Sequence, residues 1–395
     1  MSERVGLWLI GARGGVATVA SIGLLSLQQK RVNESGLVTA LPLFAEADLV
    51  DWSQIVIGGH EIRDTTLVEQ AVNFQQTSRA FAPNLVEEIK EDLAEIDQRV
   101  VPGILHRCGV TIDQLAESKI QSDHRTVDEK LGQIKQDLLN FKQENELARV
   151  VVINVSSTEP PADASQLPDT WEAAASRLEE FPISSLYSIA ALQTGCGYVN
   201  FTPSLGSNAP AICQLAEQQG LPHSGSDGKT GETLIKSALA PAFAMRNLEV
   251  LSWVGHNIFG NMDGLVLDNP ENKKTKVDSK DRLLGEILGY DPQTHISIEY
   301  IKSLGDWKTA WDHIHFQGFL GTPMVMQFTW QGCDSILASP LVLDLMRLTE
   351  RAMRAKQAGV MSSLACFFKS PMAVQENNFV HQFSMLERWV KDISV

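Results

Sequence analysis

Residues 4–30 constrain the fold of this chain more than any other segment, because an apolar run, a glycine turn and a second apolar run follow one another directly. The run VGLWLI is typical of a strand buried on both faces, and the run ATVASIGLLSL is typical of a helix that packs against such a strand. The intervening GARGG supplies a turn. A buried strand that leads directly into a helix opens a βαβ unit, so we expect an α/β protein.

The alternation of strands and helices continues through the first two thirds of the sequence. We expect a second strand at residues 36–42 (GLVTALP), ended by Pro42, and a mostly helical insertion at about residues 65–145. Further strands are expected at residues 148–154, 197–204 and 222–227, with helices between them. This alternation predicts a Rossmann-like, doubly wound parallel sheet over residues 1–245.

After Arg246 the strands become more alternating in character. The segments EVLSWVGHNI, SIEYIKSL, DHIHFQGFL and TPMVMQFTWQG predict a mixed sheet in a second α/β domain over residues 246–332. One face of this sheet would be free to pack on a helix or on another subunit. Residues 333–395 contain a long helix that we expect to return to the first domain and complete it.

The composition excludes several classes of partner. With 33 basic and 48 acidic residues, the chain lacks the broad basic surface that binding to nucleic acid or to an anionic membrane requires. No apolar run approaches the ~18 residues of a membrane span, and VGLWLI is too short for a signal peptide. The five cysteines are scattered, so neither disulfides nor a thiolate metal site is expected. We therefore expect a cytoplasmic protein.

The turn GARGGVA has the character of a dinucleotide-binding loop. Gly11, Gly14 and Ala17 have the spacing of a tight turn followed by close packing of helix and strand, with room for a pyrophosphate at the helix N-terminus. The motif departs from G-x-G-x-x-G, and the expected second strand ends at Thr39-Ala40, where a ribose-binding acid usually lies. A merely structural turn is the alternative, and the motif leaves open the choice between NAD and NADP. The predicted cofactor-binding residues are Gly11, Ala12, Arg13, Gly14, Gly15 and Val16.

Two later turns are candidates for binding a phosphate. SGSDGKTGETLIK lacks the glycine at position 223 that a P-loop requires, but it places Lys229 beside a helix that starts near Thr230. FTPSLGSNAP places small hydroxyl residues after a strand, where they either cap the next helix or grip a substrate phosphate. The predicted phosphate-binding residues are Ser204, Gly206, Ser207, Asn208 and Lys229.

The stretch NKKTKVDSK, residues 272–280, carries four lysines in an acidic chain. On a helix Lys276 and Lys280 would share a face, where like charges repel by roughly 0.2–0.5 kcal/mol. A solvated surface turn is the alternative to an anion-binding site. Other charged residues stand in a polar turn or in apolar surroundings: Asp263 (GNMDG), Lys308 (GDWKTAWD), Asp334 (QGCDSIL) and Lys369 (CFFKSP). We expect poor solvation to lower the pKa of Lys369 from ~10.4 toward ~7–8.

Taken in order, ten segments resemble inositol-3-phosphate synthase, also called myo-inositol-1-phosphate synthase, in its short archaeal and bacterial form. They are WLIGARGGVAT, GGHEIRD, VVINVSSTEP, NFTPSLGSNAPA, SGSDGKTGETLIK, HNIFGNMDG, KTKVDSKD, FQGFLG, ASPLVLDL and FFKSP, and they span nearly the whole chain. Because all ten follow the family order, the resemblance is far more specific than the glycine turn alone.

The resemblance implies an enzyme that binds NAD in a Rossmann domain completed by the C-terminal helix. The second domain would carry catalysis and build a homotetramer. The implied reaction converts D-glucose 6-phosphate to 1D-myo-inositol 3-phosphate, for inositol and phospholipid biosynthesis, by oxidation at C5, enolisation, intramolecular aldol closure and re-reduction. The NAD would be tightly bound and regenerated in each turnover, and the dependence on a divalent metal stays open.

The active-site set that the resemblance implies is Lys276, Lys280, Lys308, Lys369, Asp227, Asp263 and Asp334. Negative charge develops on sugar oxygens during this reaction, and fixed cations aimed at those oxygens would stabilise the transition states. The division of roles among the four lysines stays open. Gly255-His256-Asn257 departs from the Ser-Tyr-Asn of many family members, which bears on the sugar pocket.

Other functions fit the same scaffold. An NAD-dependent dehydrogenase, or a cyclitol synthase, would act on a different sugar phosphate, and a non-catalytic NAD-sensing protein would keep the fold alone. A dehydrogenase would release NADH, whereas the isomerase would form an inositol phosphate without accumulating NADH.

Overall fold

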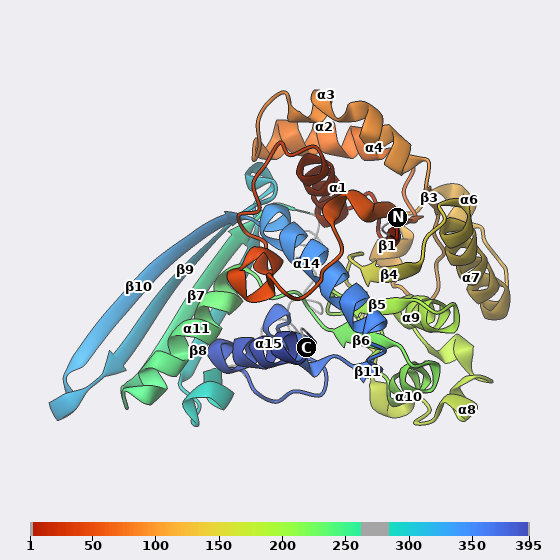
Figure 1. Ribbon diagram of the computed structural model, residues 1–395. Coiled ribbons are helices and arrows are strands. Elements are labelled where there is room, and N and C mark those ends of the chain that lie inside the picture. The colour runs from red at the N-terminus through yellow and green to blue at the C-terminus, as the bar shows by residue number, and fades with distance from the viewer. Residues whose placement is uncertain (1–2, 262–283, 394–395) are drawn as a thin grey trace.

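The computed structural model contains a seven-stranded parallel sheet and a four-stranded mixed sheet (Figure 1). It describes residues 3–261 and 284–393. The spatial order of the strands is β11-β6-β5-β4-β1-β2-β3 in the first sheet and β10-β9-β7-β8 in the second. The first order reverses direction between β1 and β4, which is the doubly wound arrangement of a Rossmann sheet. The predicted fold class is therefore confirmed.

The first sheet comprises β1 (Val5–Ile10), β2 (Ile55–Glu61), β3 (Val100–Pro102), β4 (Arg149–Asn154), β5 (Gly197–Asn200), β6 (Pro222–Gly225) and β11 (Gly359–Val360). The second comprises β7 (Glu249–Phe259), β8 (Gln293–Tyr300), β9 (Trp307–Gln317) and β10 (Pro323–Cys333). The longer helices are α1 (Gly15–Gln28), α2 (Leu67–Ser78), α4 (Lys90–Asp97), α7 (Val127–Glu144), α9 (Ile183–Gln193), α10 (Pro210–Gln219), α11 (Gly231–Met245), α14 (Asp334–Arg354) and α15 (Phe379–Ile393). The single-turn helices are α3 (Leu85–Glu88), α5 (Val110–Asp113), α6 (Ser118–Gln121) and α8 (Trp171–Ala174).

Apolar runs form the central strands because helices cover both faces of the first sheet. All six residues of β1 are buried, and β1 pairs in parallel with β2 on one side and β4 on the other. Helices α1 and α14 pack on one face, and α7, α9 and α10 pack on the other. Burial on both faces explains why these strands are continuously apolar.

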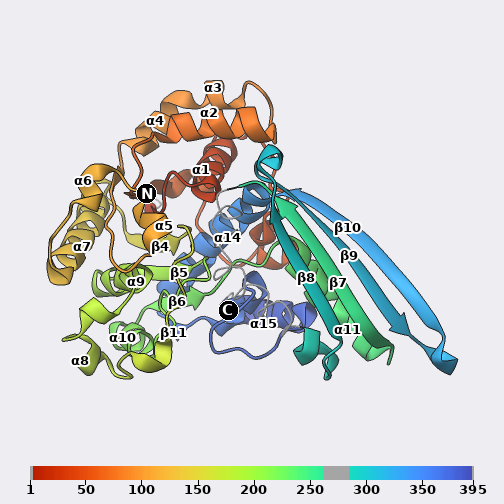
Figure 2. The same ribbon diagram turned by 180° about the vertical axis from the view of Figure 1, so that it is seen from behind.

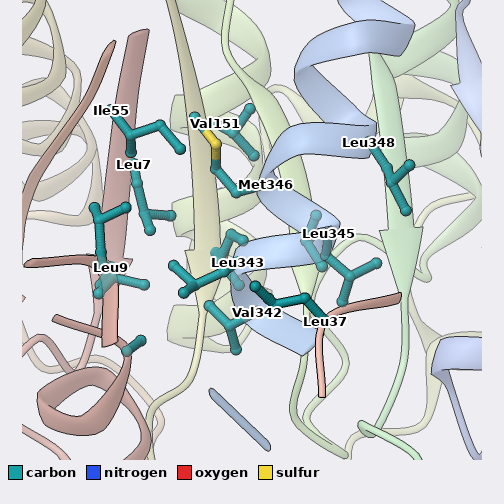
Figure 3. Close-up of a cluster of buried hydrophobic side chains, with 14 of the residues drawn as sticks. Leu7, Leu9, Leu37, Ile55, Val151, Val342, Leu343, Leu345, Met346 and Leu348 are labelled. Carbon is teal, nitrogen blue, oxygen red and sulfur yellow. The ribbon is translucent and has the colours of Figure 1, made fainter. Parts of the chain in front are cut away.

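The C-terminal part of the chain belongs to the core of the first sheet. Figure 3 shows Leu343 and Met346 of α14 beside Leu9 of β1 and Val151 of β4, all between 0% and 2% exposed. Strand β11 extends the same sheet by pairing with β6. This packing supports our proposed division into residues 1–245 with 333–395, and residues 246–332.

The predicted second strand at residues 36–42 is wrong. Residues 38–40 and 42–44 are short 3-10 helices, η1 (Val38–Ala40) and η2 (Pro42–Phe44), and the second strand is β2. The buried carboxylate of Asp344 on α14 accepts the N–H of Val38 at 2.7 Å and the N–H and hydroxyl of Thr39 at 3.0 and 2.6 Å. These long-range bonds satisfy the backbone of an apolar segment that would otherwise suit a strand.

The region expected to be a mostly helical insertion also contributes a strand. After α4 the chain returns to the sheet edge, where β3 pairs in parallel with the end of β2. Helix α7 then covers the sheet from the other face.

The second sheet has one covered and one open face. Phe243 of α11 packs against Trp253 of β7 and Phe316 of β9 on the covered face. The opposite face carries Trp311, which is 37% exposed, and no helix of the described residues lies over it (Figure 2).

Replacing Leu343 with alanine should lower the free energy of unfolding by about 2–5 kcal/mol, because it opens a cavity between α14 and the first sheet. Urea denaturation measures this cost. The matched control is Val380→Ala on α15, a position 58% exposed, where the change should stay within about 0.5 kcal/mol. Equal effects at the two positions would contradict the assignment of α14 to the core.

Candidate functional site

A cavity of about 540 Å³ opens where the two sheets meet. Its walls come from the carboxyl end of β1, the start of α1, the ends of β7 and β8, and the start of α14. Ligands of open α/β sheets bind in this position, in the crevice outside the carboxyl ends of the strands. The cavity is therefore the candidate active site.

The glycine turn forms one wall of this cavity. Gly11 has φ +81°, and a Cβ there would lie 2.9 Å from the Cα of Ser156. A Cβ on Gly15 would lie 2.8 Å from Oγ of Ser335. Gly11, Gly14, Gly15 and Val16 line the cavity, at a helix N-terminus whose N–H groups suit a pyrophosphate. Side chains at Gly11 and Gly15 would collide with Ser156 and Ser335, so the turn requires glycine there. A glycine turn at an accessible helix N-terminus fits NAD.

Ala12 and Arg13 do not line the cavity. Nε of Arg13 donates instead to Asp97 at 2.7 Å, which directs the guanidinium to α4. Ala12 and Arg13 therefore lie on the side of the turn that faces away from the cavity.

Glu61, at the end of β2, was missed in the sequence. It lines the cavity and accepts the N–H of Arg13 at 2.9 Å, as well as the Nη2 of Arg63 at 2.9 Å. Burial raises the pKa of Glu61, but bonds from Arg63 and from backbone amides outweigh burial and hold this pKa below its usual value. A carboxylate at the end of the second strand is the ribose-binding acid of NAD-dependent Rossmann folds. Had the second strand been predicted at residues 55–61, Glu61 at its end would have been recognised as a candidate.

Lys369 and Asp227 form an ion pair in the cavity wall. Nζ of Lys369 lies 2.8 Å from Oδ1 of Asp227, and the backbone N–H of Lys369 donates to the carbonyl of Asp227 at 2.7 Å. Both residues line the cavity. This doubled connection orients the lysine, and its ammonium remains partly exposed, at 23% for the side chain. The lowered pKa expected for Lys369 stays a prediction.

Lys308 and Asp334 also line the cavity, on the side of the second sheet. Nζ of Lys308 lies 5.2 Å from the ring centre of Phe259, a cation–π contact. The buried Asp306 holds the start of α14, because its Oδ2 accepts the N–H of Ser335 at 2.6 Å. Burial raises the pKa of Asp306. Asp306 was not predicted, although it stands two residues before Lys308.

Four of the seven expected active-site residues thus meet in one cavity: Asp227, Lys308, Asp334 and Lys369. The other three, Asp263, Lys276 and Lys280, lie outside the described residues.

The five residues predicted to bind a phosphate do not line the cavity as far as the structure describes it. Ser204 accepts the N–H of Glu159 at 3.0 Å, the N–H of Gly206 donates to Ser184, and Ser207 bonds to Nδ1 of His223 at 2.9 Å. These residues do not cap the next helix either, because Ala209 is the N-cap residue of α10 and no side chain caps it. Internal hydrogen bonds therefore occupy these groups.

Asn208 and Lys229 also lie away from the cavity. The N–H of Asn208 donates to Leu205 within its turn. Lys229 is 3% exposed and donates to Oε1 of Gln382 on α15. Its pKa is lowered to about 8, mainly by burial and in part by the nearby charge of Lys369. Lys229 therefore connects the turn before α11 to α15.

The start of α11 offers a better phosphate site than those residues. Thr230 and Thr233 line the cavity, and no side chain caps the N-terminus of this helix. Asn257 of β7 also lines the cavity and is 0% exposed, and within the described residues neither side-chain polar atom has a hydrogen-bond partner. Buried amides are normally paired, so Asn257 points to a ligand.

Glu159 completes the wall near α9. It is buried, lines the cavity, and its carboxylate accepts the N–H of Ser184 at 2.7 Å. Burial raises its pKa to about 7, against the opposing effect of bonds from Ser184. This acid was not predicted either, although it follows β4 closely in the sequence.

Metal-binding and membrane features are absent from the parts of the chain that the structure describes. Residues 3–261 and 284–393 contain no group of three or more His, Cys, Asp or Glu side chains arranged to hold a metal ion. Within the same residues no helix is long and apolar enough to cross a bilayer. All five cysteines are free thiols, and four of them are buried.

Solved structures show the same fold. The inositol-3-phosphate synthase of Caenorhabditis elegans superposes with a TM-score of 0.87 at 24% identity, covering 100% of this chain and 86% of the other. A myo-inositol-1-phosphate synthase-related protein of Thermotoga maritima gives a TM-score of 0.78 at 23% identity, covering 98% of both chains.

Sequence relatives carry the same name. Inositol-3-phosphate synthase 1 of Bacteroides thetaiotaomicron is 31% identical over 98% of this chain and 94% of its own length. The inositol-3-phosphate synthase of Saccharomyces cerevisiae is 27% identical over 87% of this chain and 66% of its own length. The sequence model described as "Myo-inositol-1-phosphate synthase", with an NAD-binding domain, matches residues 5–391. The chain belongs to the myo-inositol-1-phosphate synthase family.

Proposed function

We propose that this protein converts D-glucose 6-phosphate to 1D-myo-inositol 3-phosphate, with NAD that is regenerated in each turnover. The observation that carries the proposal is a single cavity lined by the glycine turn, by Lys308 and by the Lys369–Asp227 pair. A cofactor loop and fixed cations in one space suit a reaction that starts with oxidation and continues with enolate chemistry.

The cofactor would lie along the first sheet. Gly11, Gly14, Gly15 and Val16 would hold the pyrophosphate at the start of α1, with Glu61 at the ribose position. When bound, NAD supplies the hydride acceptor and donor for the C5 carbon of the sugar.

The lysines would stabilise negative charge on the sugar oxygens. Lys369, oriented by Asp227, and Lys308, beside Phe259, present ammonium groups to the cavity. Cations held there are already oriented when charge develops on the C5 and C1 oxygens, so no reorganisation is needed. Lys276, Lys280 and Asp263 remain proposed members of this set, and Asp334 remains one in the cavity wall.

The substrate phosphate would bind at the start of α11. Uncapped helix N–H groups attract a dianion, and the hydroxyls of Thr230 and Thr233 and the amide of Asn257 can donate to it. Ser204, Gly206, Ser207, Asn208 and Lys229, the residues predicted for this role, do not line the cavity.

We also propose a cytoplasmic homotetramer assembled through the second domain. The open face of the second sheet supports this, because Trp311 and Val325 there are 37% and 53% exposed. Free cysteines throughout the chain agree with a reducing compartment. The alternative function is an NAD-dependent dehydrogenase or a cyclitol synthase for another sugar phosphate.

Incubation of the purified protein with D-glucose 6-phosphate and NAD should yield an inositol phosphate without net formation of NADH. Product appears as phosphate that resists alkali and is released after periodate oxidation, while absorbance at the NADH wavelength stays flat. Formation of NADH in proportion to substrate consumed would sink this proposal and favour the dehydrogenase.

Replacing Lys369 with alanine should reduce kcat by at least about 10²–10³-fold, because it removes an oriented cation from the reacting oxygens. NAD binding and the unfolding midpoint should change little. Lys391→Ala on α15, an exposed lysine, is the matched control and should retain full activity. Near-normal product formation by Lys369→Ala would refute the site assignment.

Replacing Glu61 with alanine should weaken NAD binding at least about ten-fold, because the ribose position and the Arg13 N–H both lose their acceptor. The native protein should bind NAD more tightly than NADP, since a carboxylate repels a 2′-phosphate. Glu61→Ala should reduce the difference between the dissociation constants for NAD and NADP. Cofactor titration of the apoenzyme measures both. Glu95→Ala, at an exposed position on α4, controls for loss of a charge, and equal NAD affinity in the two variants would count against this role.

A further inference from the structure

A cluster of charged side chains lies behind the start of α11, outside the cavity. Nζ of Lys236 lies 2.6 Å from Oε1 of Glu232, one turn earlier on α11, and 3.4 Å from Oδ1 of Asp312 on β9. The three side chains are between 0% and 1% exposed. Nε1 of Trp253 on β7 donates to the same Oδ1 at 2.7 Å. Two carboxylates and one ammonium are thus enclosed between α11 and the second sheet.

This cluster is a poor choice for stability alone. Removing three charged groups from water is costly, and apolar side chains of similar volume often serve a core equally well. Burial raises the pKa of Asp312, the charge of Lys236 opposes that rise, and the charge of Glu232 adds to it. The three groups therefore influence one another strongly, and a role beyond packing is needed to explain them.

Gly255 packs directly against this cluster. A Cβ on Gly255 would lie 2.8 Å from Oε1 of Glu232, 3.2 Å from Nζ of Lys236 and 3.3 Å from Oδ1 of Asp312. Gly255 does not line the cavity. The departure from the Ser-Tyr-Asn pattern thus leaves room for buried charges and does not alter the sugar pocket directly.

The cluster is linked to the cavity through two elements. Glu232 lies between Thr230 and Thr233, which line the cavity at the start of α11. Gly255 and Asn257 lie two residues apart on the same face of β7, and Asn257 lines the cavity. A carboxylate in the first turn, such as that of Glu232, interacts favourably with the helix dipole, but it also repels an anion bound at the same end of the helix. Lys236, one turn later on α11, offsets the charge of Glu232.

We propose that the Glu232–Lys236–Asp312 cluster sets the charge behind the phosphate-binding end of α11 and thereby sets the affinity for the substrate phosphate. This inference rests on the phosphate position in the proposed function. The three residues are positioning residues, because they act through the helix N-terminus and do not touch the phosphate. When ionised, these three side chains together contribute one net negative charge, which moderates binding of a dianion.

The test changes this charge one unit at a time in the full-length protein with NAD bound. Glu232→Gln and Asp312→Asn each remove a negative charge, and an asparagine at 312 can still accept the bond from Trp253. Each should tighten binding of inorganic phosphate and of glucose 6-phosphate about three- to ten-fold. Lys236→Met removes the positive charge and should weaken both about ten-fold.

The double variant Glu232→Gln/Lys236→Met restores the native net charge, so its dissociation constants should return to within about three-fold of the native values. Calorimetry at low ionic strength measures them. The dissociation constant for NAD should stay constant, because the pyrophosphate site lies on α1. Lys391→Met controls for loss of a lysine elsewhere.

A charge effect predicts that phosphate affinity rises in Glu232→Gln and Asp312→Asn, falls in Lys236→Met, and returns to the native value in the double variant. Structural damage to the protein would instead weaken phosphate binding in every variant. Unchanged or weaker phosphate binding in both Glu232→Gln and Asp312→Asn would overturn the inference, and these two variants decide it even when Lys236→Met fails to fold. Failure of the proposed function has a separate signature: the native protein would form no inositol phosphate, while the binding of inorganic phosphate would still follow the charge of the cluster.

Discussion

The packing of α14 on the seven-stranded sheet is the interaction on which the rest of this structure depends. Helix α14 follows β10 directly, so one continuous segment belongs first to the second sheet and then to the core of the first. Burial of Val342, Leu343 and Met346 against β1 and β4 thus fixes where the two sheets meet (Figure 3). The cavity lies at that junction, and Asp306 of the second domain holds the first turn of α14 in place.

The positive groups at the cavity offset the negative charge of the protein as a whole. A protein of formal net charge −15 repels sugar phosphates and dinucleotides at long range. This repulsion is offset at the cavity by the N-termini of α1 and α11 and by the ammonium groups of Lys308 and Lys369. Asp227 keeps Lys369 aligned, and the acids nearby limit the repulsion between the cations.

The fold could be predicted from sequence because its signals are local. Apolar runs on either side of a glycine turn identified β1 and α1, a buried apolar run identified β4, and the more alternating pattern after Arg246 indicated the mixed sheet. The second strand was misplaced because residues 36–42 have strand character by composition, and only Asp344, some three hundred residues later, makes them turn. Glu61, which we propose to bind the ribose of NAD, was missed for the same reason, since it ends the strand that was not recognised.

Sequence likewise identified some residues of the candidate site and missed others. Lys308, Lys369, Asp227 and Asp334 were identified by residue type and by the family resemblance, whereas their convergence required the tertiary structure. Residues 204–207 looked like phosphate ligands because nothing local shows that Ser204, the N–H of Gly206 and Ser207 already bond to Glu159, Ser184 and His223, respectively. Conversely, Glu232 and Lys236 have the i,i+4 spacing of an ordinary surface pair, and no local signal indicates that both are buried.

The Lys369–Asp227 pair joins positions 142 residues apart, which has a consequence for biosynthesis. A ribosome releases the first six strands of the parallel sheet before α14, β11 and Lys369 exist as folded chain. At that stage the face of β1 and β4 that α14 later covers is still bare, and Asp227 has no Lys369 to pair with. The glycine turn and Lys308 are therefore made early, whereas the Lys369–Asp227 pair forms only when synthesis is nearly finished, so the proposed active site is completed last.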